Sequence, residues 1–359
     1  MNTDVLLERR GPLGLVTLNR PKALNALDLG MIRALHPALE AWARDAEVKA
    51  VVIRGAGGRA FCSGGDVRAV ALSLGTPAAE GQQPLSRAFF REEYRLNHLI
   101  HHYPKPYIAL VDGISMGGGL GLSVHGSHRV VTERLMLAMP ETAIGLFPDV
   151  GGGWFLPRFP GETGTYLGLT GTRCNAADAM WLGYGTQHVT HDRLEAVVEA
   201  LAAADWSAGD SREVATRVLS GFATEPGASA LSAHREAIDR CFGKDSIEDI
   251  LAALEAEGTP WAEETRATLG RMSPTSLKVT LRQLRLCRGR SYDEVVTVEY
   301  RLSQHCTALP DFREGIRAVL VDKDNRPTWN PPALAQVRAT DVEACFAPVA
   351  DEERVLRHE

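Results

Sequence analysis

The sequence lacks the features that mark several protein classes. None of its apolar runs approaches the roughly 20 residues of a membrane helix. A formal net charge of -6 at pH 7 gives no general positive field for nucleic acid, so a phosphate-bearing ligand would need local Lys, Arg or backbone N–H groups. The 6 cysteines include no C-x-x-C pair and no Cys/His spacing suited to zinc. These absences argue against a membrane protein, a nucleic-acid partner and a metal site, and they predict reduced thiols.

The N-terminal segment Met1–Arg10 also lacks a familiar targeting signal. It contains no apolar stretch for secretion, and it includes acids that a mitochondrial transit peptide avoids. We therefore expect a cytoplasmic protein. With 45% hydrophobic and 23% charged residues the composition is that of a globular chain, and 359 residues exceed one typical domain. We expect one large α/β domain with a smaller addition, or two domains.

The pattern of apolar residues predicts an α/β first half and a helical second half. Predicted strands lie at Leu13–Leu18, Ala50–Arg54, Tyr107–Val111 and Arg129–Thr132. Predicted helices lie at Arg87–His102, Glu195–Ala203, His234–Glu257, Trp261–Met272, Ser276–Leu286 and Asp293–Cys306, with Ser273-Pro274 as a helix start and Val295, Val298 and Leu302 on one apolar face. Residues 74–86 are predicted to be a loop that could form a mobile border of an active site. We therefore divide the chain into residues 1–190 and 191–359.

Two glycine motifs suggest functions that the neighbouring residues do not support. Gly55-Ala-Gly57-Gly-Arg-Ala60 follows a strand and matches a dinucleotide-binding loop, but no convincing helix follows it. Gly113-Ile-Ser115-Met-Gly117 matches a nucleophile elbow, yet no histidine stands out as its partner and the usual His-Gly-Gly-Gly oxyanion loop is missing. A Ser115 hydrolase stays an alternative. The favoured interpretation of Ser115 is a small buried residue at a strand-to-helix turn.

Glycine-rich turns follow predicted strands within Phe61–Asp66 and Gly113–Gly121. A turn from a strand into a helix leaves backbone N–H groups unpaired and pointing outward. The two turns together fit an oxyanion hole for a thioester carbonyl, with Gly65 and Gly118 as donors. One such donor contributes roughly 3–4 kcal/mol of transition-state stabilisation. The alternative is that these glycines serve only tight turns and close packing.

The same segments carry a family resemblance. Ala60–Asp66 and Gly113–Gly119, followed by Met-Pro-Glu-Thr, resemble the crotonase (enoyl-CoA hydratase/isomerase) superfamily. The runs Phe90–Tyr94, Met139–Gly153 and Asp311–Asp324 resemble its 3-hydroxyisobutyryl-CoA hydrolase branch, and the likeness covers roughly residues 5–332. The resemblance implies a crotonase-like spiral of ββα units that binds coenzyme A thioesters with two backbone donors. The helical C-terminal part would complete or cover the site.

The resemblance also implies which acids are catalytic. Glu141 matches the catalytic Glu that remains, Asp149 matches an acid that the hydrolase branch adds, and Glu93 matches a third acid of the site. Where the hydratases carry a second catalytic Glu, this chain has Gly121. Syn addition of water to an enoyl thioester normally uses two carboxylates, so this change should impair hydration.

The residues themselves leave alternatives open for each acid. Apolar neighbours of Glu141 would raise its pKa if they bury it, but Glu141 could also be an ordinary carboxylate that caps a short helix. Asp149 could cap the helix that follows it. Helical spacing alone does not choose between Glu92 and Glu93 as the inward-facing acid, and the resemblance favours Glu93.

The remaining site residues also follow from the resemblance. Gly64, Asp66 and Phe147 join Glu93 as predicted substrate-binding residues. The segment Pro21–Ala26 lies near the CoA nucleotide in the superfamily, so Lys22, Ala23 and Ala26 are predicted CoA-binding residues, with Arg20 beside them. Lys22 could neutralise a phosphate, and it could equally be a solvated surface residue.

The predicted function is hydrolysis of a short β-hydroxyacyl-CoA, with 3-hydroxyisobutyryl-CoA of valine degradation as the expected substrate. Glu141 would activate water or attack the carbonyl, Asp149 would assist proton transfer, and Glu93 would bind the 3-hydroxyl or orient Glu141. We expect no cofactor beyond the CoA of the substrate. A homo-oligomer is implied by the superfamily, although the helical second half could cover the same surface within one subunit. The alternatives are an enoyl-CoA hydratase and a non-catalytic acyl-CoA-binding protein.

Overall fold

The computed structural model describes residues 3–75 and 83–356. The backbone divides into two compact units, each built from three segments. Unit 1 comprises Met1–Gly65, Leu96–Leu137 and Cys174–Ser232, and unit 2 comprises Asp66–Arg95, Ala138–Arg173 and Ala233–Glu359. The predicted division at residue 190 stays a prediction. The predicted mobile loop over residues 74–86 falls largely on residues 76–82, outside the described residues.

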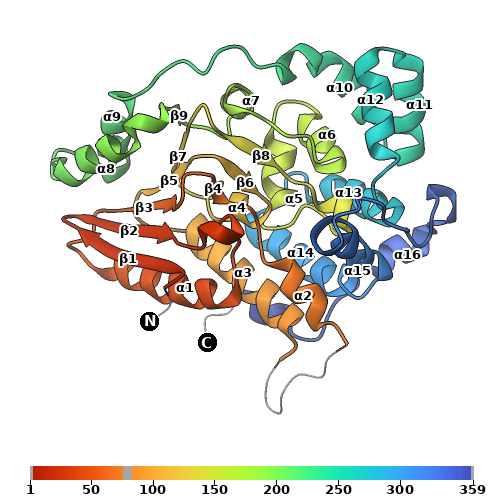
Figure 1. Cartoon of the computed structure of the whole chain (residues 1–359), viewed down its shortest axis with the longest axis horizontal. Coiled ribbons are helices and arrows are strands. Elements are labelled where there is room, and N and C mark those ends of the chain that lie inside the picture. The colour runs from red at the N-terminus through yellow and green to blue at the C-terminus, as the bar shows by residue number, and fades with distance from the viewer. Residues whose placement is uncertain (1–2, 76–82, 357–359) are drawn as a thin grey trace. The chain divides into compact units, whose positions relative to one another are not determined.

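Unit 1 is built on a six-stranded sheet with the order β1-β2-β3-β5-β7-β9 (Figure 1). β1 and β2 are antiparallel, and every later neighbouring pair is parallel. The bounds are β1 Val5–Arg10, β2 Leu13–Leu18, β3 Ala50–Gly55, β5 Tyr107–Val111, β7 His128–Val131 and β9 Gln187–His188. The four strands predicted from apolar runs are therefore confirmed, two of them to the residue.

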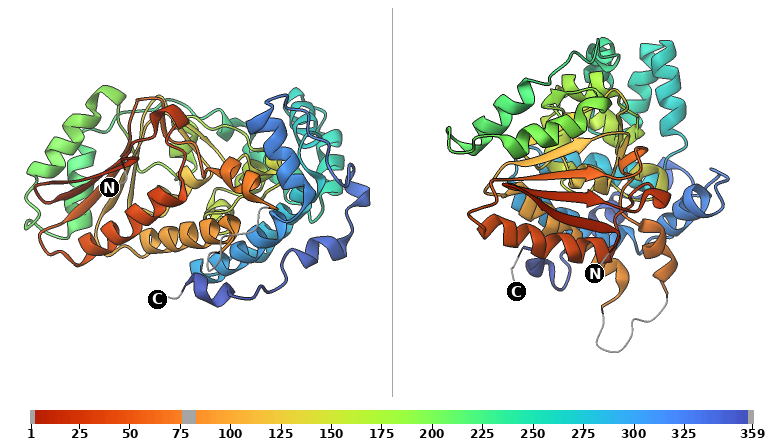
Figure 2. Two further views of the ribbon diagram at one scale, coloured as in Figure 1. Left: turned by 60° about the horizontal axis from the view of Figure 1, so that its bottom comes forward. Right: turned by 60° about the vertical axis from the view of Figure 1, so that its left-hand side comes forward.

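Helices cover both faces of this sheet, as the views of Figure 2 show. The helices of unit 1 are α1 Leu29–Arg44, α4 Gly118–Gly121, α7 Ala176–Trp181, α8 Leu194–Ala203 and α9 Ser211–Ser220. α8 and α9 bury Val197, Leu201 and Leu219 in one core with sheet residues such as Val52. α1 lies on the other face, where a Cβ atom at Gly14 of β2 would meet the ring of Trp42.

A second, three-stranded sheet has the order β4-β6-β8. Its strands are β4 Ala60–Cys62, β6 Ile114–Met116 and β8 Met136–Ala138. β4 and β6 are parallel neighbours, so their carboxyl ends lie at the same edge. Both predicted glycine-rich turns begin at this edge.

Unit 2 is mostly helical. Its helices are α2 Val67–Ser73, α5 Gly152–Phe155, α6 Thr163–Thr170, α10 Arg235–Phe242, α11 Ile247–Glu257, α12 Pro260–Leu269, α13 Pro274–Cys287, α14 Tyr292–Cys306, α15 Pro310–Ile316 and α16 Ala339–Ala344; α3 Leu85–His101 begins in unit 2 and ends in unit 1. The predicted start at Ser273 is confirmed, because its hydroxyl accepts the Ser276 N–H at 3.1 Å.

One helix prediction is wrong. The single helix expected over His234–Glu257 is broken into α10 and α11. α10 ends before Gly243, and Ser246 caps α11 by accepting the Asp249 N–H at 3.0 Å. A local cap therefore outweighed the continuous apolar pattern.

The fading of strand signal after residue 190 is confirmed, since no strand follows β9 in the described part of the chain. All 6 cysteines lie among the described residues, where they are buried and form no disulfide, as expected for structural thiols. Among the described residues, no helix is both long and apolar enough to cross a membrane.

Candidate active site

The two glycine-rich turns of unit 1 lie against each other. Gly64 has φ +116° and Gly117 has φ +47°, conformations that favour glycine. A Cβ atom at Gly64 would lie 3.9 Å from the backbone nitrogen of Gly118. A Cβ atom at Gly119 would overlap the carbonyl oxygen of Cys62. The glycines therefore allow close approach of two backbone segments that are far apart in the sequence.

The predicted donors of these turns have N–H groups that secondary structure does not use. Gly118 is the first residue of α4, where a backbone N–H has no acceptor within the helix. Leu27 and Gly65 form a parallel bridge in which the Leu27 N–H donates to the Gly64 carbonyl at 2.8 Å. This register does not use the Gly65 N–H. The role of both groups as oxyanion donors stays a prediction.

Ser115 does not have the surroundings of a nucleophile. It is fully buried on β6 and lies beside the hydroxyl of Tyr184, which is itself buried and bonded to the Ser123 hydroxyl at 2.7 Å. A serine nucleophile must be reached by the ester or thioester carbonyl. The burial of Ser115 therefore favours the packing interpretation of the Gly113–Gly117 motif.

Unit 2 brings the three predicted acids together. Glu93, Glu141 and Asp149 are 2%, 5% and 5% exposed. Burial and the charges of Asp149 and Glu141 raise the pKa of Glu93 well above its ordinary value, and such charge effects require proximity. Glu93 rather than Glu92 is the fully buried acid of α3, as the resemblance implied.

These acids have strongly perturbed proton affinities. Burial, and next the charge of Asp149, raises the pKa of Glu141 well above its ordinary value. Burial raises the pKa of Asp149 to about 7, and a hydrogen bond donated by the Tyr94 hydroxyl to its Oδ2 at 2.8 Å limits the rise. In the described part of the chain, Oε2 of Glu141 and Oε1 of Glu93 are buried with no hydrogen-bond partner. Asp149 thus titrates near neutral pH, which suits a carboxyl group to proton transfer.

Asp149 is not the cap of the helix that follows it. The N-terminus of α5 is capped by Glu299 instead, which accepts the Gly151 N–H at 2.7 Å and the Gly153 N–H at 2.8 Å. The Asp149 side chain points to Tyr94. The structural alternative for Asp149 is therefore wrong, and its carboxyl group is left for another role.

Sequence reasoning missed Tyr94 and Glu299. Glu299 lies four residues after Val295 and next to Val298, on the helix face that the sequence predicts to be apolar. A carboxylate on an apolar helix face is the signal that could have found it, because an acid is rarely buried without a partner. Tyr94 has no comparable signal beyond its place next to Glu93.

The other predicted substrate-binding residues, Phe147, Asp66 and Gly64, each have different contacts. Phe147 is fully buried in unit 2. Asp66 is the N-cap residue directly before α2, and its side chain accepts the Ala69 N–H at 3.3 Å, so it has a capping role. Gly64 accepts the Leu27 N–H in unit 1. Substrate binding by these residues stays a prediction.

The predicted CoA-binding segment lies at the surface of unit 1. Lys22 and Ala23 are exposed and Ala26 is partly buried. Arg20 donates to the Ala26 carbonyl at 2.7 Å and pairs with Asp28 at 3.4 Å, so it holds the segment together. Lys22 is thus the better candidate of the two cations for a phosphate contact.

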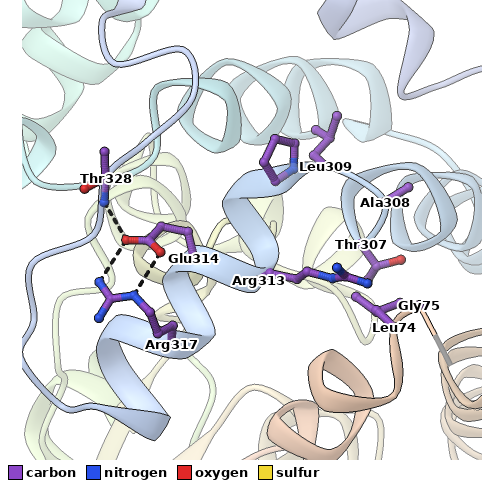
Figure 3. Close-up of a pocket in the computed structure, with 10 residues that line it drawn as sticks. Leu74, Gly75, Thr307, Ala308, Leu309, Arg313, Glu314, Arg317 and Thr328 are labelled. Carbon is purple, nitrogen blue, oxygen red and sulfur yellow. Dashed lines mark hydrogen bonds and ion pairs between the residues drawn. The ribbon is translucent and has the colours of Figure 1, made fainter.

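A cavity of about 1050 Å³ opens in unit 2 beside α15 (Figure 3). Arg317 is held there by Glu314 at 2.9 Å, and Glu314 also accepts the Thr328 N–H at 2.7 Å. The cavity is lined by Leu74, Gly75, Thr307, Ala308, Leu309, Pro310, Arg313, Glu314, Arg317 and Thr328. None of the predicted site residues lines this cavity.

Comparison with known proteins identifies relatives over almost the whole chain. The family model described as "Enoyl-CoA hydratase/isomerase" matches residues 13–346. The human protein named "3-hydroxyisobutyryl-CoA hydrolase, mitochondrial" is 46% identical over 348 residues, covering 96% of this chain and 88% of that protein. The Danio rerio protein of the same name is 47% identical, covering 99% of this chain and 92% of that protein.

Solved structures share the fold. A Mycobacterium thermoresistibile protein described as a carnitinyl-CoA dehydratase has a TM-score of 0.88 at 42% identity, covering 97% of both chains. A Rhodobacter sphaeroides protein described as an enoyl-CoA hydratase has a TM-score of 0.86 at 38% identity, covering 98% of this chain and 99% of that one. The predicted crotonase-like α/β fold class is confirmed.

The expectation of a cytoplasmic location is wrong. The human and Danio rerio relatives are both named as mitochondrial, which points to mitochondria rather than the cytoplasm. The expectation rested on the composition of Met1–Arg10, and the lack of a recognisable local signal is not positive evidence for a compartment.

Proposed function

Because the chain belongs to the enoyl-CoA hydratase/isomerase family, we propose that it hydrolyses 3-hydroxyisobutyryl-CoA to 3-hydroxyisobutyrate and free CoA. The proposal rests on the shared name of the human and Danio rerio relatives, "3-hydroxyisobutyryl-CoA hydrolase, mitochondrial". These relatives are 46% and 47% identical to this protein over nearly the full chain. The reaction belongs to valine degradation. The substrate supplies its own CoA, and the chemistry needs no further cofactor.

The thioester carbonyl is activated by backbone donors. In this proposal its oxygen accepts the N–H groups of Gly65 and Gly118 as negative charge develops on it. Removing one donor of this kind typically lowers kcat by about 100- to 1000-fold. Backbone donors suit this role because they are fixed before the substrate arrives.

Glu141 acts on the activated carbonyl. It either removes a proton from water or attacks the carbonyl to form a transient anhydride. The support for Glu141 is its burial, its unpartnered Oε2 among the described residues and its raised pKa. Transfer of ¹⁸O from water into the Glu141 carboxyl group over many turnovers would mark the anhydride route.

Asp149 and Glu93 assist Glu141. Asp149, with a pKa of about 7, exchanges protons with water and with the departing thiolate at neutral pH. Glu93 binds the 3-hydroxyl of the substrate or orients Glu141. Loss of a hydrogen bond to a substrate hydroxyl would relax the preference for hydroxyacyl over acyl thioesters.

CoA binding and assembly are further parts of the proposal. Lys22 contacts a phosphate of CoA, while Ala23 and Ala26 face the nucleotide. Gly64, Asp66 and Phe147 bound the acyl part of the substrate. The protein assembles as a homo-oligomer, which light scattering coupled to size-exclusion chromatography would test.

The proposal is tested by product analysis. Purified protein is incubated with 3-hydroxyisobutyryl-CoA and, separately, with crotonyl-CoA, and the products are identified by mass spectrometry. Free CoA and hydroxy acid from the first substrate, with little hydration of the second, is the expected result. The variant Glu141→Gln serves as the matched control, because it keeps the volume of the side chain but cannot act as a base.

A hydratase is the second candidate function, and the descriptions of the two solved relatives favour it. Gly121 opposes it, because the second carboxylate expected for syn hydration is absent from that position. Hydration of crotonyl-CoA without release of CoA would support the hydratase. Acyl-CoA binding with no turnover of either substrate would support a non-catalytic binding protein.

A further inference from the structure

The backbone around Asp149 is held by a fully buried carboxylate from another helix. Glu299 of α14 has no exposed surface, and its two carboxylate oxygens accept the Gly151 N–H at 2.7 Å and the Gly153 N–H at 2.8 Å. Each oxygen therefore has its own backbone donor. Burial raises the pKa of Glu299 to about 8, and the hydrogen bonds from Gly153 and Gly151 limit this rise.

A buried amide from a third helix completes the same contact. Gln283 of α13 donates through Nε2 to the Pro148 carbonyl at 2.8 Å and to Glu299 Oε1 at 3.2 Å. Pro148 directly precedes Asp149, and Gly151 follows it by two residues. Glu299 and Gln283 thus fix the backbone on both sides of Asp149.

The fixed backbone has an unusual shape. Val150 has φ +51° and Gly151 has φ +90°. A left-handed conformation is costly for a β-branched residue, and it persists only where the surroundings enforce it. The hydrogen bonds of Glu299 and Gln283 are suited to enforce it, since they hold the peptide group between Val150 and Gly151 and the peptide group between Pro148 and Asp149.

We propose that Glu299 and Gln283 are positioning residues that keep the Asp149 carboxyl group in place for catalysis. This inference rests on the proposed function, in which Asp149 transfers protons. A helix cap alone would not require a buried carboxyl group from a distant helix, because a Ser, Thr, Asn or Asp at the N-cap position satisfies the same N–H groups. Gly151 occupies that position in α5, and the capping group comes from a residue 148 positions further along the chain.

The test compares Glu299→Gln and Gln283→Leu with wild type. Glu299→Gln keeps the shape but turns one amide N–H group toward a backbone N–H group, and Gln283→Leu removes the contact with the Pro148 carbonyl. We expect kcat to fall by about 10- to 100-fold with KM unchanged within about 3-fold, because displaced catalytic groups slow chemistry more than binding. Glu294→Gln, on the exposed N-terminus of the same helix, is the matched control and should keep wild-type kcat.

A double-mutant cycle separates positioning from general stability. In an Asp149→Asn background, Glu299→Gln should lower kcat by less than about 3-fold further, because its effect acts through Asp149. Full multiplication of the two losses would overturn the proposal. Unchanged kcat in both folded single variants would also overturn it, and if Glu299→Gln does not fold, Gln283→Leu alone decides the outcome.

A second readout does not depend on activity. Amide hydrogen exchange over residues 149–153 should be slow in wild type and at least about 10-fold faster in both variants, while exchange in Glu294→Gln stays at the wild-type rate. Fast exchange of this segment in wild type would show that Glu299 and Gln283 do not hold the backbone around Asp149. Absence of CoA release by the wild-type protein, with slow exchange retained, would refute the proposed function. It would not refute the role of Glu299 and Gln283 in holding this backbone segment.

Discussion

The hydrogen bond between Tyr94 and Asp149 offers the sharpest test of how the acids work. The Tyr94 hydroxyl donates to Asp149 Oδ2 at 2.8 Å inside unit 2, and this bond stabilises the ionised carboxylate. The substitution Tyr94→Phe removes the donor and keeps the ring. Loss of a hydrogen bond to the charged form must raise the pKa of Asp149.

The size of the effect follows from the strength of such a bond. A hydrogen bond to a charged group contributes about 1.5–3 kcal/mol, and 1.36 kcal/mol corresponds to one pKa unit, so the pKa of Asp149 should rise from about 7 to about 8–9. At pH 7 the ionised fraction of Asp149 would fall from about one half to about 1–10%. If ionised Asp149 is the active form, kcat/KM at pH 7 should fall about 5- to 50-fold.

The assay is the loss of thioester absorbance with 3-hydroxyisobutyryl-CoA between pH 5.5 and 9.5. The acidic limb of the profile should move to higher pH in Tyr94→Phe, and activity at pH 9 should recover to within about 2-fold of wild type. Tyr300→Phe is the matched control, since it removes another buried hydroxyl of unit 2 that lies 3.5 Å from Asp351. An unmoved limb, or an equal loss at every pH in a folded variant, would refute the reasoning.

Four further predictions can be checked by similar measurements. Glu141→Gln should lower kcat by about 100- to 10,000-fold without loss of CoA binding, measured by steady-state kinetics and calorimetric titration; retention of activity would contradict the assignment. Ser115→Ala should keep activity within about 3-fold, and inactivation would favour the serine hydrolase. Asp149→Asn should keep weak but measurable activity, with kcat about 100- to 10,000-fold below wild type, yet be more stable at pH 8 by an amount on the order of 4 kcal/mol. The folded pKa of about 7 exceeds the ordinary 3.8, so stability falls as pH rises between these values. Thermal melts at pH 4 and pH 8 would show whether the gain is confined to the higher pH. Gly119→Ala should destabilise the protein by about 1–3 kcal/mol, because its Cβ atom would meet the Cys62 carbonyl; an unchanged melting temperature would contradict that packing.

Much of the fold could be predicted from local patterns. β2 and β5 lie where the apolar runs placed them, because a strand buried on both faces needs a continuous run of such residues. The helical second half and the start at Ser273 also follow from local signals. The break between α10 and α11 was missed, since the apolar pattern continues across it while the cap of Ser246 ends it.

The identity of the candidate acids was also available from the sequence, through the motifs that contain Glu141, Asp149 and Glu93. The burial, hydrogen bonds and protonation of these acids were not available from it. The choice of Glu93 over Glu92 depends on which side of α3 is buried, and helical spacing fits both residues. The exclusion of Asp149 as a helix cap depends on Glu299, which lies far away in the sequence.

The sequence by itself determined the strands, the glycine turns and the acid residues, because these depend on local periodicity and on the chemistry of single side chains. Only the tertiary structure decided how the acids titrate and what holds them. Tyr94 reaches Asp149 across 55 positions, and Glu299 reaches Gly151 across 148. Desolvation and hydrogen bonds between distant segments set the pKa of a buried carboxyl group, and no local pattern encodes either of them.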